Sequence, residues 1–152
     1  MATGIRGHHL RKGRVSQIGY FYILTAVVAN RRPAFQDWRA GRLVVEQFRS
    51  AEESGLVRSI AWVVMPDHFH WLVELRHKTL SELMCRVKSR SSRSMNRSQQ
   101  WGGPLWQRGY YDRALRQDDD LRKAARYIVA NPLRAGLVQR VGDYPLWDAL
   151  WI

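Results

Sequence analysis

The 152-residue chain has a single cysteine, Cys85, so no disulfide can form within it and nothing in its cysteine content points to an oxidising compartment. It also lacks a long apolar run, because the longest one, residues 20–29, has about half the length that a membrane-spanning helix needs. Residues 1–14 carry charges but no apolar core, so no signal peptide is expected. These absences favour a cytoplasmic, nucleoid-associated protein that does not bind a membrane.

Acidic residues are scarce: 13 Asp and Glu stand against 25 Lys and Arg, which gives a formal net charge of +12. Lysine is scarce too, since 4 of the 25 basic residues are Lys and 21 are Arg. The planar guanidinium group of arginine binds phosphates in a bidentate manner and stacks on bases. Nucleic acid is therefore the expected partner, ahead of an anionic membrane or a charge that serves solubility alone.

The composition predicts one folded domain preceded by a basic arm. An apolar content of 45% and 7 tryptophans are typical of a globule with a proper core. Residues 1–17 are rich in glycine and in basic residues, among them Arg11, Lys12 and Arg14. We expect this arm to follow a DNA backbone, and we expect residues 18–152 to form a single domain.

The order of the expected elements predicts an α+β fold. Alternating and helical apolar patterns indicate, in order, a strand, a helix, two strands, a helix, an irregular strand and a helix, at residues 20–28, 37–54, 57–65, 68–75, 79–97, 105–116 and 118–131. This is the ferredoxin-like split βαβ plan, a four-stranded antiparallel sheet with two helices on one face. A C-terminal helix that bears Tyr127 follows it.

Two histidines two positions apart are the first candidate site. They directly follow the turn Met65-Pro66-Asp67, and side chains alternate along a strand, so His68 and His70 should share one face. Two neutral imidazoles side by side can hold one divalent metal ion. The alternative is a pair of ordinary histidines on a strand.

Tyr127 and Asn131 are spaced i and i+4 on the last helix, which places them on one helical face. A tyrosine can act as a nucleophile, and a metal ion on the histidines can polarise a phosphate that it attacks. Asn131 can then supply an oxygen ligand to the same ion. The alternatives are a half-buried helix aromatic for Tyr127 and a helix-ending residue for Asn131, while Tyr110 and Tyr111 compete for the nucleophilic role.

The later part of the helix after residue 79 carries a basic face that we expect to grip phosphates, formed by Arg86, Lys88, Arg90, Arg93 and Arg97. The alternative is a solvated helix end. Three aromatic residues of the irregular strand can stack on unpaired bases or pack in the core: Trp106, Tyr110 and Tyr111.

Three ordered motifs resemble a known family. Residues 65–72, MPDHFHWL, are similar to the His-hydrophobic-His signature of single-tyrosine HUH transposases of the IS200/IS605-like group. Residues 105–113, LWQRGYYDR, and 127–138, YIVANPLRAGLV, are similar to the REP-associated tyrosine transposase branch. The resemblance implies a ferredoxin-like endonuclease that uses Mg²⁺ or Mn²⁺, with Tyr127 as nucleophile and His68 and His70 as metal ligands.

The same resemblance implies a 5′-phosphotyrosine intermediate and a single-stranded or hairpin DNA substrate of the repetitive extragenic palindrome kind. It places Asn131 where related enzymes carry a glutamine, which is longer by one methylene. Three alternatives remain open: a non-catalytic ferredoxin-like module for single-stranded nucleic acid, a replication initiator or relaxase, and a small ribonucleoprotein component. The sequence also leaves open whether the protein is a monomer or a homodimer.

Overall fold

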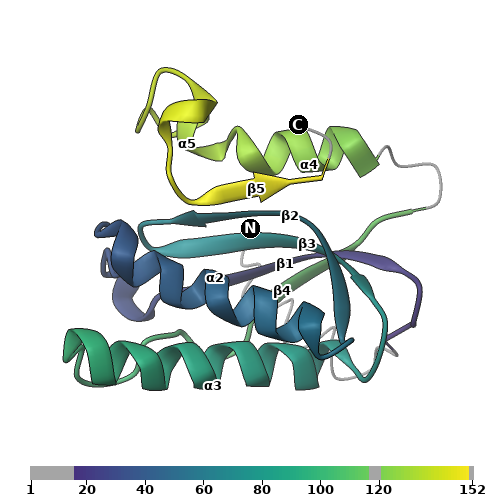
Figure 1. Cartoon of the computed structure of the whole chain (residues 1–152), viewed down its shortest axis with the longest axis horizontal. Coiled ribbons are helices and arrows are strands. Elements are labelled where there is room, and N and C mark those ends of the chain that lie inside the picture. Colours follow the sequence, from purple (N-terminus) through teal and green to yellow (C-terminus); the bar gives the residue numbers. More distant parts are fainter. Residues whose placement is uncertain (1–15, 117–120, 151–152) are drawn as a thin grey trace.

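The computed structural model describes residues 16–116 and 121–150. A five-stranded antiparallel sheet runs through it, with strand order β4-β1-β3-β2-β5 (Figure 1). The strands are β1 (Phe21–Val27), β2 (Val57–Met65), β3 (His68–Leu75), β4 (Tyr111–Ala114) and β5 (Trp147–Ala149). The helices are α2 (Trp38–Glu53), α3 (Leu80–Gln99), α4 (Leu121–Val129) and the short α5 (Asn131–Arg134).

The two long helices begin where their capping residues stand. Asp37 caps α2 by accepting a hydrogen bond from the backbone N–H of Arg39 at 3.0 Å. Thr79 and Glu82 form a reciprocal capping box at the start of α3. Both the single cap and the capping box satisfy N–H groups that have no partner inside the helix. The starting positions of both helices therefore follow from local sequence.

The helices form layers on both faces of the sheet (Figure 1). On one face lie α2 and α3, where Phe48 packs against Phe69 and Trp71 at ring-centroid distances of 5.0 and 4.4 Å. On the opposite face lies α4, whose Ala125 and Ile128 belong to a second apolar cluster with residues of β2 and β3. Burial of each large apolar side chain stabilises the fold by roughly 1.5–3 kcal/mol, so both layers are firmly attached.

The structure confirms the α+β antiparallel plan with two helices on one face and a tyrosine-bearing helix elsewhere, and it adds a fifth strand. That strand, β5, pairs with β2 through residues 61–63. The expected irregular strand over 105–116 is regular only in β4, and the segment before it makes a single bridge between Val28 and Trp106. Within the described residues, no helix is both long and apolar enough to cross a membrane.

Candidate active site

The two histidines share the sheet face that α4 covers. Phe69, Trp71 and Val73 of β3 belong to the core under α2 and α3, whereas Leu72 belongs to the cluster under α4. Because side chains alternate along a strand, His68 and His70 point to the α4 side. Their ring centroids lie 4.9 Å apart with the planes at 77°, so the predicted side-by-side pair is present.

The strand register continues the site across the sheet as a row of directly opposed residues. His70 pairs with Thr25 of β1 on one side and with Val63 of β2 on the other. Thr25 in turn pairs with Tyr111 of β4. Directly opposed residues of antiparallel strands point to the same face, so Thr25 and Tyr111 lie on the histidine side of the sheet.

Each imidazole is held through its Nδ1 atom. The Nδ1 atom of His70 lies 2.7 Å from the hydroxyl oxygen of Thr25. The Nδ1 atom of His68 lies 2.7 Å from a carboxylate oxygen of Asp67, whose other oxygen accepts a hydrogen bond of 3.1 Å from Arg31. Partners at Nδ1 fix the ring orientation and leave the Nε2 atom as the nitrogen that could bind a metal ion, which is the usual arrangement around metal-binding histidines.

The electrostatics of the pair favour neutral imidazole at His70. Burial, the neighbouring His68 and the positive charge of Arg134 together lower the pKa of His70 to about 4. For Asp67, burial acts to raise the pKa, but the hydrogen bond and charge of His68 and those of Arg31 outweigh it and hold the pKa below its usual value. Metal binding requires a neutral imidazole, which is the form that this lowered pKa favours at His70.

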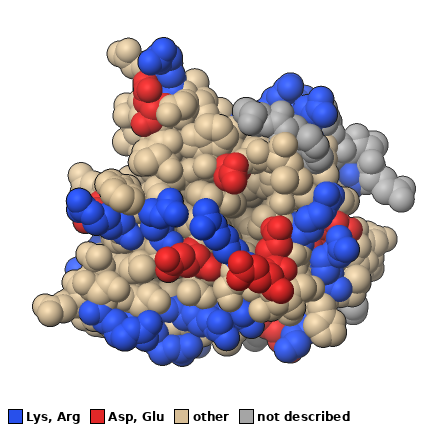
Figure 2. Space-filling model, viewed as in Figure 1, with Lys and Arg blue, Asp and Glu red and all other residues tan. Residues whose placement is uncertain are grey.

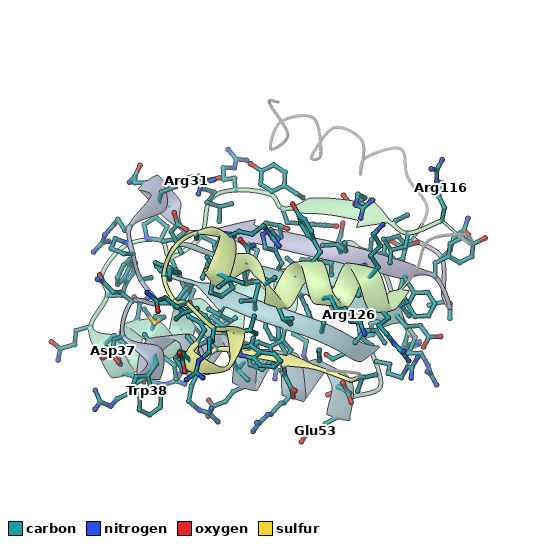
Figure 3. All side chains as sticks on the ribbon, turned by 90° about the horizontal axis from the view of Figure 1, so that it is seen from above. Arg31, Asp37, Trp38, Glu53, Arg116 and Arg126 are labelled. Atoms are coloured by element: carbon teal, nitrogen blue, oxygen red, sulfur yellow. The ribbon has the colours of Figure 1, made fainter. Side chains whose placement is uncertain are left out.

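Tyr127 lies near the C-terminal end of α4 and is 66% exposed. Seen from above, α4 crosses the sheet, and its junction with α5 lies toward the same end of the molecule as Arg31 (Figure 3). Arg31 is bonded to Asp67, beside His68. Arg134 contacts Tyr127, with its guanidinium carbon 3.7 Å from the centroid of the Tyr127 ring, and its positive charge is one cause of the lowered pKa of His70. The exposure of Tyr127 removes the alternative that it is a half-buried packing residue.

Asn131 is the first residue of α5 and is half-buried. Its backbone oxygen accepts a hydrogen bond from the N–H of Ala135, so this main-chain group is engaged within the helical turn. Among the described residues, no three His, Cys, Asp or Glu side chains are grouped to hold a metal ion. The donor set therefore fits a divalent ion only as two imidazole nitrogens completed by oxygen ligands, such as an amide, water or phosphate.

The structure separates the other aromatic candidates. Tyr110 is 8% exposed, and its hydroxyl lies 3.3 Å from that of Ser81 at the start of α3, away from the histidine face. Trp106 is also 8% exposed, packs against Phe35 and Phe69, and donates to the Ser91 hydroxyl at 2.9 Å. Base stacking by Trp106 and Tyr110 was therefore the wrong expectation, because apolar contacts and buried hydrogen bonds commit both rings to the core.

The predicted basic face of α3 divides into two groups. Lys88 donates to the carbonyl oxygens of Gln107 and Gly109 at 2.8 and 2.5 Å, and Arg86 donates to the hydroxyls of Ser50 and Ser54. Arg90 reaches Ser50 at the longer distance of 3.5 Å. Arg93 and Arg97 are exposed, as is Arg90. Figure 2 shows lysine and arginine side chains along the lower edge of the view, over α3, and the sheet separates this surface from the histidines.

The predicted arm residues Arg11, Lys12 and Arg14 lie outside the described residues. The last two positions of the expected arm are attached to the fold: the Ser16 hydroxyl accepts from the N–H of Leu80, and the N–H of Gln17 donates to the Tyr22 hydroxyl, both at 3.0 Å.

Sequence reasoning missed the residues that hold or bridge the candidate site. Thr25 was visible only as a hydroxyl in an apolar strand, and its distance of 45 positions from His70 hid the contact. Asp67 precedes His68 directly, and its carboxylate was a usable signal. Arg134 follows Tyr127 by seven positions, which is two helical turns and therefore the same face.

Known proteins are similar to this chain in sequence and in fold. A family model described as "Transposase IS200 like" matches residues 16–131. The chain belongs to the IS200-like transposase family. It is 27% identical over 143 residues to a Haemophilus influenzae relative named for the REP-associated tyrosine transposases, a match that covers 84% of this chain and 78% of that protein.

Two further proteins agree with this assignment. The REP-associated tyrosine transposase of Escherichia coli K12 is 29% identical over 87 residues, which cover 56% of this chain and 50% of that protein. A solved structure of a REP-associated tyrosine transposase bound to a REP hairpin superposes with a TM-score of 0.75 at 23% identity, covering 88% of this chain and 79% of that chain. The last match shows the fold, and the family model identifies this chain as a transposase.

Proposed function

We propose that this transposase is a metal-dependent endonuclease and strand transferase of the HUH type, which cleaves single-stranded DNA through a covalent tyrosine intermediate. The observation that carries the proposal is an exposed Tyr127 on α4, the helix that covers the sheet face with two neighbouring, oriented imidazoles. A nucleophile beside a metal-binding pair is the arrangement that phosphoryl transfer requires.

The reaction is a transesterification. The Tyr127 oxygen forms a bond to phosphorus as the bond from phosphorus to the 3′-oxygen breaks, which leaves a 5′-phosphotyrosine and a free 3′-hydroxyl. The proton lost from the phenol is balanced by the one that the 3′-oxygen gains, and no oxidant or cofactor is consumed. Because the covalent link retains one phosphoester bond in place of another, attack by a second 3′-hydroxyl can rejoin the strand without ATP.

His68 and His70 are the proposed ligands of a Mg²⁺ or Mn²⁺ ion, with Asn131 contributing through its amide oxygen or through water. The ion, when bound, polarises the scissile phosphate and offsets the charge that develops on it. Thr25 and Asp67 would hold the two rings so that both Nε2 atoms face the ion. The lowered pKa of His70 supports this role, because the ring carries a free lone pair at neutral pH.

The proposed substrate is a DNA hairpin with unpaired flanks, since a relative of the same fold was solved with a REP hairpin. Arg93 and Arg97 are the α3 residues proposed to contact its backbone, together with the basic arm at residues 1–17. Tyr111 is the aromatic residue left for stacking on a base, because it is half-buried on the histidine face. DNA that touches both α3 and the histidines must pass around an edge of the sheet.

The test is covalent capture. Incubation with a pool of hairpin oligonucleotides and Mn²⁺ should give a protein–DNA adduct that survives a denaturing gel, and chelation with EDTA should abolish it. Tyr127→Phe should lower adduct formation by roughly 10³-fold or more, because no other oxygen replaces the nucleophile. DNA affinity should change less than about threefold, since the phenol hydroxyl is one contact among many.

Tyr111→Phe is the matched control, because it removes the other phenol on the histidine face and should retain the adduct. A Tyr127→Phe protein that still forms the adduct would show that the nucleophile is misassigned. Binding without any adduct or metal dependence would instead support the non-catalytic module for single-stranded nucleic acid.

A further inference from the structure

Arg134 differs from the paired arginines of the fold in having no acidic partner. Several other arginines form ion pairs, namely Arg31, Arg39, Arg58, Arg76 and Arg140. Within residues 16–116 and 121–150, no carboxylate forms an ion pair with Arg134, although its side chain lies at the candidate site. An exposed guanidinium held in place without an anion is suited to receive one from a ligand.

The backbone around Arg134 is firmly held. The chain passes from α4 into α5 with Ala130 still in a helical conformation, and the N–H of Arg134 donates to the Ala130 oxygen at 3.0 Å. Pro132 is buried at the start of α5. Gly136 then ends the helix with φ +74°, a conformation that favours glycine. Tyr127 and Arg134 are therefore presented on the same side by two connected helices.

The guanidinium of Arg134 lies over the Tyr127 ring, with its carbon 3.7 Å from the ring centroid. Within residues 16–116 and 121–150, its N–H donors form no hydrogen bond or ion pair. Five such donors match the oxygens of a phosphate.

We propose that Arg134 binds the phosphate that Tyr127 attacks, with the guanidinium face on the phenol ring and its N–H edge on the non-bridging oxygens. The inference rests on the proposed function for its chemistry and names a substrate-contacting residue beyond the histidines, Asn131 and Tyr127. In this role Arg134 sets the phosphorus beside the phenol oxygen and offsets negative charge in the transition state. The ligand it takes is a phosphodiester of single-stranded DNA.

The first arm of the test measures chemistry. Single-turnover adduct formation at saturating hairpin DNA should fall about 10²-fold in Arg134→Gln, the size of effect seen when one donor to a developing oxyanion is removed. Arg134→Lys should recover only part of the rate, because lysine keeps the charge but loses the planar fork. Arg126→Gln, an exposed arginine on α4 (Figure 3), is the matched control and should stay within about threefold.

The second arm measures binding and does not depend on cleavage. The Tyr127→Phe protein would first select a tight-binding hairpin from a pool with randomised unpaired flanks. Single neutral methylphosphonate replacements would then scan its backbone. At one position the replacement should weaken DNA binding by the Tyr127→Phe protein. The same replacement should cause no further loss of affinity when Arg134→Gln is combined with Tyr127→Phe. When Arg126→Gln is combined with Tyr127→Phe instead, the replacement should weaken binding as before.

The two arms separate the failures. If the wild type forms no adduct but one phosphate is coupled to Arg134, the cleavage proposal fails and the phosphate contact stands. A different outcome would overturn the role of Arg134. In that outcome the adduct forms, Arg134→Gln and Arg126→Gln give it at the same rate, and no phosphate is coupled to Arg134. Thermal unfolding of each variant excludes misfolding as the cause of a lost signal.

Discussion

His70 shows how a single buried ring joins the chemistry of the candidate site to the stability of the fold. It hydrogen-bonds Thr25 on the neighbouring strand and lies under α4, so its charged form is disfavoured there. In the unfolded chain the same ring titrates near 6.5. At pH values between the folded pKa of about 4 and the unfolded pKa, the unfolded state binds more protons than the folded state. The folded state therefore loses stability as the pH falls.

The free energy of unfolding should therefore drop as the pH is lowered from about 6.5 toward 4. With a folded pKa of about 4, His70 alone should cost about 2 kcal/mol between pH 7.5 and pH 5. Urea unfolding at both values, with EDTA present, measures the total change. His70→Gln removes this titration, so the difference between the two proteins isolates the ring, and an equal pH dependence in both would contradict the account.

Sequence spacing predicted the shared face of His68 and His70 because alternation along a strand is a local property. Of the two partners at Nδ1, one is local in sequence and the other is not. Asp67 is adjacent to His68, whereas Thr25 reaches His70 only through the pairing of β1 with β3. Pairing between distant strands is not encoded in local periodicity. The ring orientations could therefore be predicted only for His68.

At the scale of elements, α3 carries basic residues with different tasks. Lys88 holds the segment before β4 through two carbonyl groups, which allows Trp106 and Tyr110 to enter the core without a regular ladder. Local composition predicted a strand over the whole of residues 105–116. It could not show that Lys88 of α3 holds the first part of this segment, where Trp106 and Tyr110 lie. The bounds of β2 and β3 were predicted as observed, since their apolar runs end at the turn Met65-Pro66-Asp67. The three-residue β5 was too short to carry a periodic signal.

Because the basic residues of α3 have different tasks, removing positive charge at different positions should have different effects on stability and on DNA binding. Lys88→Met should lower the free energy of unfolding by about 1.5–3 kcal/mol, because charge-assisted bonds to backbone oxygens are lost. Arg93→Gln combined with Arg97→Gln should leave stability within about 0.5 kcal/mol. The double variant should instead reduce the slope of log affinity against log salt for hairpin DNA by about 2. Urea unfolding and fluorescence anisotropy across a salt series measure the two effects.

The opposite pattern, with Lys88→Met reducing the salt slope and the double arginine variant unfolding easily, would overturn the assignment. An unchanged slope in the double variant would show that DNA does not reach the far side of the sheet.

At the scale of the whole molecule, every proposed catalytic group belongs to one chain. The helix α4 packs on β2 and β3 of the same fold, and Arg134 of the same chain lies against Tyr127. The ferredoxin-like plan was predictable because the order of its elements fixes which segments are neighbours. The placement of α4 over the histidine face was not, since a short amphipathic helix packs equally well on either apolar surface.

The continuous path from the sheet to α5 predicts that one protein molecule completes its own site. Tyr127→Phe and His70→Gln should each be inactive in covalent capture, and a mixture of the two should remain inactive, below roughly 1% of the wild-type yield. A site shared between two chains would behave differently, because half of all dimers in an equal mixture would be heterodimers, and each heterodimer would have one site with an intact Tyr127 beside an intact His70. The mixture should be prepared by co-unfolding and refolding so that subunits can exchange, with wild type carried through the same procedure as the control. Restored adduct in the mixture would mean that α4 serves the histidine face of a second copy.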